Sequence, residues 1–130
     1  MDTYESYLQH PAGSVLPFEE ALQIYNDMAA GIERCRSEYK DEIVQEFLQK
    51  AGAYAAIRAE WGLWSREKRR EEDAHRTMRH NLVIDSLNIL CRLLNNEGIE
   101  TPWREQLGDE RKRIGDFACF TAYIAGVNNR

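Results

Sequence analysis

Two histidines and two arginines lie close together in the middle of the chain, at a spacing that could build a site. The stretch SREKRREEDAHRTMRHNLVIDSLNILCRLLNNE, residues 65–97, has a strongly charged first half and an apolar second half. At about 100° per residue, the apolar half forms one helical stripe that contains Val83, Leu87, Leu90 and Leu94. Followed toward the N-terminus, the stripe runs into Arg79 and Arg76, with His75 and His80 on its flanks. The buried face of this helix is therefore expected to continue as a cationic face.

Arginines at the edge of a core need partners. Arg58 falls inside the apolar stripe of residues 41–61, and a buried arginine is costly unless its charge is paired. We expect Arg58 either to extend its charged end to solvent or to meet a carboxylate from another helix. We take Arg58, Arg76 and Arg79 as candidate ligand-binding residues. Their charges need either an anionic ligand or protein carboxylates, for which the candidates are Glu42, Glu46 and Asp116. Of these two interpretations, the sequence favours an internal salt-bridge network.

The same region raises the question of a metal site. Glu72 and His75 have the Glu-x-x-His spacing of di-iron carboxylate bundles, but such bundles need the motif twice and two further glutamates. His75 and His80 are five residues apart, hence about 140° apart around a helix. They lie on different faces and cannot both coordinate one metal ion. We predict no metal site and no cofactor.

Arg70 and His75 have an Arg-x4-His spacing. In this spacing the chain resembles the small all-helical HEPN ribonucleases and antitoxin-paired toxins, over six residues. The resemblance implies a dimer cleft that acts on RNA, with Arg70 and His75 in the site and His75 as acid or base. The chain departs from the family at Glu71, where a small polar residue is usual, and in the position of the motif, which usually lies near the chain end.

His80 is a third catalytic candidate. His80 and Asn81 loosely resemble the phospho-accepting helix of bacterial histidine kinases and phosphotransfer bundles. In those helices a polar group usually follows four residues later, where this chain has Ile84. The chain also shows no nucleotide-binding domain.

Composition restricts the function classes. The chain has 130 residues, 43% hydrophobic and 30% charged, which suits one domain with its own core. Its net charge of −5 makes nucleic-acid binding unlikely and attraction to an anionic membrane weak. The longest nearly apolar stretch, residues 117–127, is short of the ~20 residues that span a bilayer, and no signal peptide is apparent. Three widely spaced cysteines, Cys35, Cys91 and Cys119, indicate buried, reduced thiols in a cytoplasmic protein.

Helical periodicity predicts the elements that would position these residues. We expect an N-terminal arm over residues 1–16 and a single helical-bundle domain over 17–130. Within the domain, helices are predicted from 18 to about 37 or 39, from 41 to 61, from 65 to 97, at WREQL (103–107) and from 109 to 127. Ser65 is expected to cap the long helix, and Gly98 and Gly108 to end helices. The predicted fold class is all-α, a bundle of four main helices with a short helix before the last.

The last of these helices is apolar on several faces, which indicates that it is either central in the bundle or shared with a second copy. Its candidate interface residues are Phe117, Phe120, Tyr123, Ile124 and Val127. The leading hypothesis is a self-associating interaction module, a dimer without catalysis that can also take a protein partner. The alternative is a HEPN-like RNA-acting bundle, or one that binds an anion or metal, with a site around Arg70, His75, Arg76, Arg79 and His80.

Overall fold

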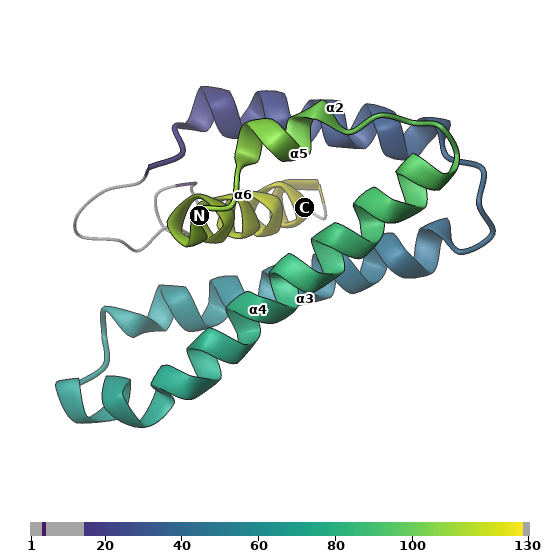
Figure 1. The fold of residues 1–130 in the computed structure, drawn as a ribbon. Coiled ribbons are helices and arrows are strands. Elements are labelled where there is room, and N and C mark those ends of the chain that lie inside the picture. Colours follow the sequence, from purple (N-terminus) through teal and green to yellow (C-terminus); the bar gives the residue numbers. More distant parts are fainter. Residues whose placement is uncertain (1–3, 5–14, 129–130) are drawn as a thin grey trace.

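The computed structural model describes Tyr4 and residues 15–128, and these residues contain helices and no strand. In chain order the helices are α2 (Phe18–Arg34), α3 (Lys40–Trp61), α4 (Arg66–Asn96), α5 (Pro102–Leu107) and α6 (Arg111–Asn128), as Figure 1 shows. The predicted all-α class, with four main helices and a short one before the last, is confirmed.

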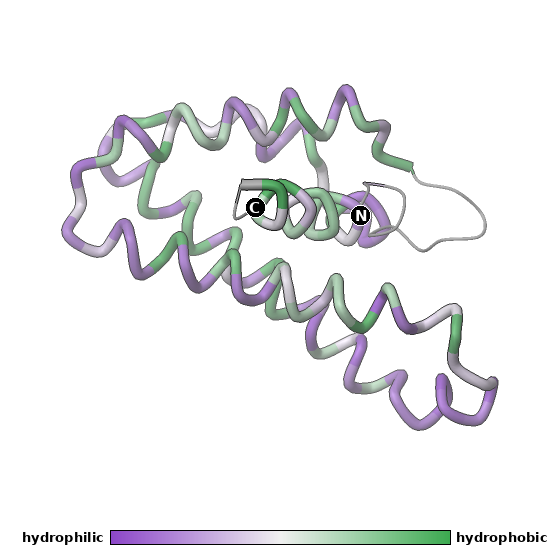
Figure 2. The backbone as a smooth tube through the Cα atoms, turned by 180° about the vertical axis from the view of Figure 1, so that it is seen from behind, coloured by the Kyte–Doolittle hydropathy of each residue, from purple (hydrophilic) through white to green (hydrophobic). Residues whose placement is uncertain are grey.

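A long antiparallel hairpin of α3 and α4 forms one side of the molecule (Figure 1). The opposite side is formed by α2 and α5, and α6 lies between the two sides in both Figure 1 and the reverse view of Figure 2. The end of the hairpin that joins α3 to α4 projects beyond α6. Figure 2 shows that this projecting end is mostly hydrophilic, whereas α6 is largely hydrophobic. The cationic half of α4 therefore starts outside the bundle and enters it near the first turn of α6.

Three predicted helix boundaries rest on local chemistry and are confirmed. The Ser65 hydroxyl accepts a hydrogen bond from the Lys68 N–H at 3.1 Å and caps α4, as its short polar side chain suits it to do. Gly98 and Gly108 have φ angles of 75° and 80°, a left-handed conformation that glycine adopts without strain. They follow α4 and α5 and stop both helices.

Two other predicted boundaries are wrong. α2 ends at Arg34 instead of continuing to 37 or 39, because Cys35 is extended and the Arg36 N–H donates to the Glu97 carboxylate at 2.8 Å. α6 begins at Arg111 and not at Asp109. The Asp109 carboxylate instead pairs with Arg104 at 3.1 Å. In both cases contacts with another side chain replace the helical turn that the pattern predicted.

α6 is the central element of the core. Its first half contributes five apolar side chains that are almost completely buried, namely Ile114, Phe117, Ala118, Cys119 and Phe120. Phe117 stacks on Phe47 of α3, and Phe120 contacts Tyr25 of α2 edge-on. Packing against both sides of its own chain explains why this half of the helix is apolar on several faces.

The segment before α2 takes part in the core where it is described. Leu16 is fully buried, and the Tyr4 hydroxyl donates to its carbonyl at 2.8 Å. The Tyr4 ring packs edge-on against Phe18 and Phe120. The rest of the predicted arm, residues 1–3 and 5–14, lies outside the described residues.

Cys35, Cys91 and Cys119 are all buried and unpaired, as the sequence predicted. Burial raises the pKa of the Cys91 thiol to about 11 and that of Cys119 to about 12, so both stay protonated and unreactive near neutral pH. Within the described part of the chain, no helix combines the length and the apolar character needed to cross a bilayer.

Candidate functional site

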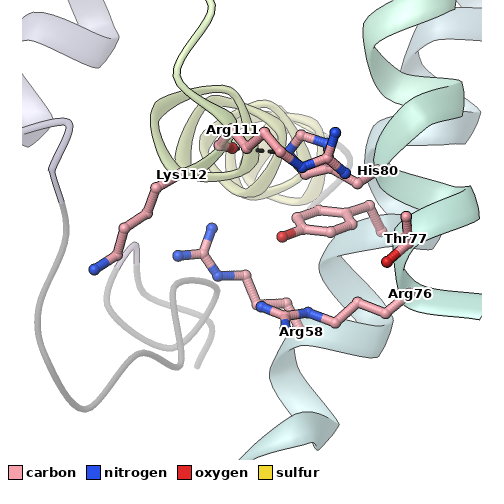
Figure 3. Close-up of a pocket in the computed structure, with 7 residues that line it drawn as sticks. Arg58, Arg76, Thr77, His80, Arg111 and Lys112 are labelled. Carbon is pink, nitrogen blue, oxygen red and sulfur yellow. Dashed lines mark hydrogen bonds between the residues drawn. The ribbon is translucent and has the colours of Figure 1, made fainter. Parts of the chain in front are cut away.

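A cavity of about 340 Å³ lies where α3, α4 and the first turn of α6 meet (Figure 3). We call it the cationic cavity. Its lining consists of Tyr54 and Arg58 from α3, Arg76, Thr77 and His80 from α4, and Arg111 and Lys112 from α6. Four of these seven residues are cations and none is an acid. Three helices therefore contribute cations to the lining of one concave site.

Arg58 is the deepest of the four cations, with 3% of its surface exposed. One of its terminal nitrogens, Nη2, donates to Asp116 Oδ1 of α6 at 2.6 Å, which confirms that a carboxylate on another helix pairs with this arginine. The second Asp116 oxygen accepts the N–H groups of Val15 and Leu16 at 2.9 and 3.1 Å. Asp116 is thus fully engaged away from the cavity. The Arg58 Nε has no partner among the described residues.

The other three cations lack a carboxylate partner among the residues that the structure describes. Arg76 lies with its guanidinium carbon 4.5 Å from the centre of the Trp61 ring, a cation–π contact. Arg111 donates from Nη1 to the neutral amide oxygen of Asn81 at 3.0 Å. The Lys112 side chain makes no hydrogen bond or ion pair within the described chain. The contacts of Arg76 and Arg111 orient these two side chains but do not neutralise their charge.

His80 forms an uncharged part of the lining. It is 5% exposed, and its Nε2 lies 2.7 Å from the Arg111 carbonyl oxygen, which can only accept, so Nε2 carries the hydrogen. Burial lowers the pKa of His80, as do the charges of Arg111, Arg58 and Arg76, against the opposing effect of the carbonyl hydrogen bond. The ring is therefore neutral at pH 7. Its Nδ1 is buried without a partner among the described residues.

Tyr54 completes the inner wall. Its ring packs edge-on against His80, with centroids 5.2 Å apart. Burial raises the pKa of Tyr54, partly offset by the Arg58 and Arg76 charges, so the hydroxyl remains a donor. A Cβ at Gly115 of α6 would come within 2.9 Å of the Tyr54 hydroxyl and 3.0 Å of Arg58 Nη1. Glycine at this position lets α6 approach α3 closely enough to close the cavity.

The structure separates the sequence candidates into two groups. Arg58, Arg76 and His80 meet in the cationic cavity. Arg70 is exposed on the projecting part of α4. The His75 ring is half-exposed and lies between Glu72, 3.1 Å from Nδ1, and Arg79, whose Nε donates to His75 Nε2 at 3.0 Å. Arg79 borders a different, smaller cavity. The Arg70 and His75 pair and the cationic cavity are thus distinct places on α4.

Four lining residues were not among the sequence candidates. Arg111 and Lys112 belong to a basic first turn of the last helix, which the helix dipole disfavours, and that misfit was the available signal. Tyr54 sits at a core position of its helix, and Thr77 carries no pattern that would single it out. To predict the cavity one must know which helices meet, and the periodicity of apolar residues does not specify this.

Possible metal ligands do not gather in the described chain. No group of three or more His, Cys, Asp or Glu side chains is close enough there to hold an ion. Glu72 and His75, which have the di-iron spacing, hydrogen-bond to each other, and Glu72 also pairs with Lys68 at 3.3 Å.

The five candidate interface residues of α6 differ in accessibility. Phe117 and Phe120 are buried inside their own chain and offer no surface to a partner. Tyr123 and Ile124 are half-buried, and Val127 is 42% exposed. Of these five α6 candidates, only the three in the last turns of the helix leave surface for a partner.

No known protein family, curated protein or solved structure matches this chain. Its function must accordingly be argued from the chemistry of the site.

Proposed function

We propose that this protein binds a small anionic ligand in the cationic cavity. The observation that carries the proposal is the charge of the lining, which has four cations and no acid. Asp116 neutralises Arg58 from behind, and the charges of Arg76, Arg111 and Lys112 remain uncompensated by carboxylates of the described chain. Cations held together repel one another, most strongly where water is partly excluded. An anion in the cavity would remove that repulsion.

An internal salt-bridge network explains the site less well. It accounts for Arg58, whose partner is only 2.6 Å away. It does not account for the other three cations of the lining, which have no carboxylate partner in the described chain. The two remaining acids that the sequence suggested as partners for the arginines are elsewhere. Glu46 pairs with Lys50 on the surface at 3.3 Å, and Glu42 borders a separate apolar cavity.

The proposed role is binding, in a cytoplasmic protein. The three unpaired buried thiols support a reducing compartment. Self-association through the end of α6 remains a separate prediction and does not affect the anion site, because Tyr123, Ile124 and Val127 are outside its lining. The Arg70 and His75 resemblance to HEPN ribonucleases also remains a separate prediction.

The test is an NMR titration of the amide spectrum with inorganic phosphate and with sulfate. We expect shifts that concentrate at the amides of Thr77, His80, Arg111 and Lys112. Arg76→Gln should weaken binding about tenfold or more, because a hydrogen bond to a charged group contributes about 1.5–3 kcal/mol.

Arg70→Gln is the matched control, since it removes the same charge from an exposed position of the same helix. It should leave the affinity within about twofold, because charges exposed to water are screened. Absence of shifts around the cavity, or equal weakening by both variants, would contradict anion binding at this site.

A further inference from the structure

We infer that the ligand is a small organic phosphate monoester, held by its dianionic phosphate group in the cationic cavity. The inference rests on the proposed function and adds the chemical class of the ligand. Three properties of the lining carry it: its charge, its supply of hydrogen-bond donors and its size.

The charge of the lining suits a dianion. Four cations face the cavity and one, Arg58, has a counter-ion in Asp116, so three positive charges remain. A carboxylate or a sulfate ester brings one negative charge. A phosphate monoester carries about −1.5 to −2 at pH 7, and it therefore offsets more of the repulsion among Arg76, Arg111 and Lys112.

The lining offers mainly hydrogen-bond donors. Arginine guanidinium groups match the oxygens of phosphate in paired hydrogen bonds, and lysine adds a point charge. The hydroxyl groups of Tyr54 and Thr77 can donate as well, and Arg58 Nε is buried without a partner. A group with three unprotonated oxygens and no hydrogen to donate fits such a lining, because each oxygen can accept from more than one donor.

The cavity has room for more than phosphate. Its volume of about 340 Å³ lies within the range of about 300–1,000 Å³ that is typical of small-molecule sites. A bare phosphate fills only part of it. The uncharged part of the lining, the Tyr54 ring and the neutral His80 ring, is then available to an organic body attached to the phosphate.

The arrangement differs from that expected for a nucleic-acid backbone. A polynucleotide carries one charge per phosphodiester. A protein that binds its backbone has basic residues in a stripe along the surface that the strand covers. Here the cations line a single cavity in a chain whose net charge is −5. The terminal phosphate of an RNA strand has the same chemistry as a free monoester, however, so the experiment must separate these two sources.

Isothermal titration calorimetry with phenyl phosphate and phenyl sulfate provides the test, because the two probes share one organic body. At about pH 7.5 the phosphate is a dianion and the sulfate a monoanion. We expect phenyl phosphate to bind at least about tenfold more tightly, since its second charge acts at close range on several cations, of which Arg58 is buried. Near pH 5, below the second phosphate pKa of about 6, the ratio should fall toward one.

The ratio of the two affinities reports the effect of the charge of the ligand, because the two probes share one organic body. The groups that face it are Tyr54 and Arg58 from α3, Arg76 and His80 from α4, and Arg111 and Lys112 from α6, with Asp116 behind Arg58. Any change in their protonation acts on both probes. Arg76→Gln should lower the affinity for phenyl phosphate about tenfold and reduce the ratio, whereas Arg70→Gln should leave the ratio unchanged.

The outcomes separate the inference from the proposed function. Equal affinities at pH 7.5 would overturn the phosphate assignment and leave anion binding intact. If neither probe nor inorganic phosphate binds, anion binding itself is wrong. A short RNA with a 5′-phosphate that binds more tightly than phenyl phosphate, while its 5′-hydroxyl counterpart does not bind, would assign the phosphate to a strand end and overturn the small-molecule ligand.

Discussion

At the scale of single residues, Asp116 connects three parts of the chain. Its carboxylate binds Arg58 of α3 and the backbone N–H groups of Val15 and Leu16, and it is fully buried. A buried ion pair gives little net stability relative to apolar residues, but the loss of one partner leaves an uncompensated charge in the interior. The position of Arg58 in the cationic cavity therefore depends on Asp116.

Asp116→Asn should lower the free energy of unfolding by about 3–5 kcal/mol, because Arg58 would remain buried without its counter-ion. Urea denaturation measures this loss. Glu46→Gln is the control, since it breaks the surface pair with Lys50 and should cost only about 0.5 kcal/mol. Similar small losses in both variants would show that Arg58 finds water or another partner.

His80 should make stability depend on pH. Its folded-state pKa is lowered by burial and by neighbouring arginines, so the unfolded chain binds a proton more readily. The contribution of His80 to stability is therefore present above its unfolded pKa of about 6.5 and is lost as the pH falls below that value toward the folded pKa.

His80→Gln removes the titration and keeps a side-chain N–H that can reach the Arg111 carbonyl. Between pH 7 and 5, we expect the wild-type protein to lose more free energy of unfolding than this variant, in urea denaturation at a series of pH values. Parallel pH profiles would mean that His80 titrates alike in the folded and unfolded chains.

At the scale of elements, the first turn of α6 opposes its own helix dipole. Arg111, Lys112 and Arg113 stand where acidic residues are favoured. Arg113 is compensated by Glu20 at 2.6 Å and by the Leu107 carbonyl at 2.9 Å. Lys112 has no such compensation in the described chain, so we expect its charge to reduce the stability of the unliganded protein.

Lys112→Gln should therefore raise the free energy of unfolding by about 0.5 kcal/mol without ligand, because an unfavourable charge leaves the helix N-terminus. The same variant should bind phosphate more weakly. Arg113→Gln is the contrasting variant and should be destabilising, since it loses several hydrogen bonds. Both effects are measurable by urea denaturation with and without phosphate, and a loss of stability in Lys112→Gln would argue for a purely structural role.

The contact between α3 and α6 should be sensitive to a single methyl group. In Gly115→Ala the new Cβ would lie 2.9 Å from the Tyr54 hydroxyl, and we expect a loss of about 1–3 kcal/mol from overpacking. Gly52→Ala in α3 meets nothing within 4 Å and should instead stabilise by about 0.5–1 kcal/mol through helix propensity. Thermal denaturation of the two variants gives the comparison, and equal shifts would mean that α6 can move away from α3.

At the scale of the whole molecule, the bundle leaves only a small part of α6 at the surface. The apolar first half of the helix is used inside the chain, and Val127 is the most exposed of the candidate interface residues. A dimer through this end would be built around the last turns of the helix and would leave the cationic cavity open to ligand.

Val127→Glu should dissociate such a dimer, because a charge buried at the interface is unfavourable. Analytical ultracentrifugation over a wide range of protein concentrations measures the oligomeric state. Ile89→Glu, at an exposed position of α4, should leave it unchanged. A wild-type protein that sediments as a monomer throughout would rule out self-association.

Local chemistry made much of this fold predictable from the sequence. The spacing of apolar residues specified helices and the faces they bury, and Ser65 and Gly98 marked helix ends through hydrogen bonding and backbone preference. The buried position of Arg58 required a carboxylate, and Asp116 was a candidate because it stands beside the aromatic side of the last helix. These inferences succeed because each depends on neighbours along one helix or on a strong energetic requirement.

The cavity was decided only by the tertiary structure. Periodicity shows which face of a helix is buried but not which helix covers it or how far the two are shifted along their axes. Arg111 follows Arg58 by 53 residues, and the two line one site because Gly115 lets α6 approach α3. The sequence by itself determined that basic residues would stand at the edge of the core. The packing of the helices decided that four basic residues line the cationic cavity and that no acidic residue does. The distances between helices determine which charges interact.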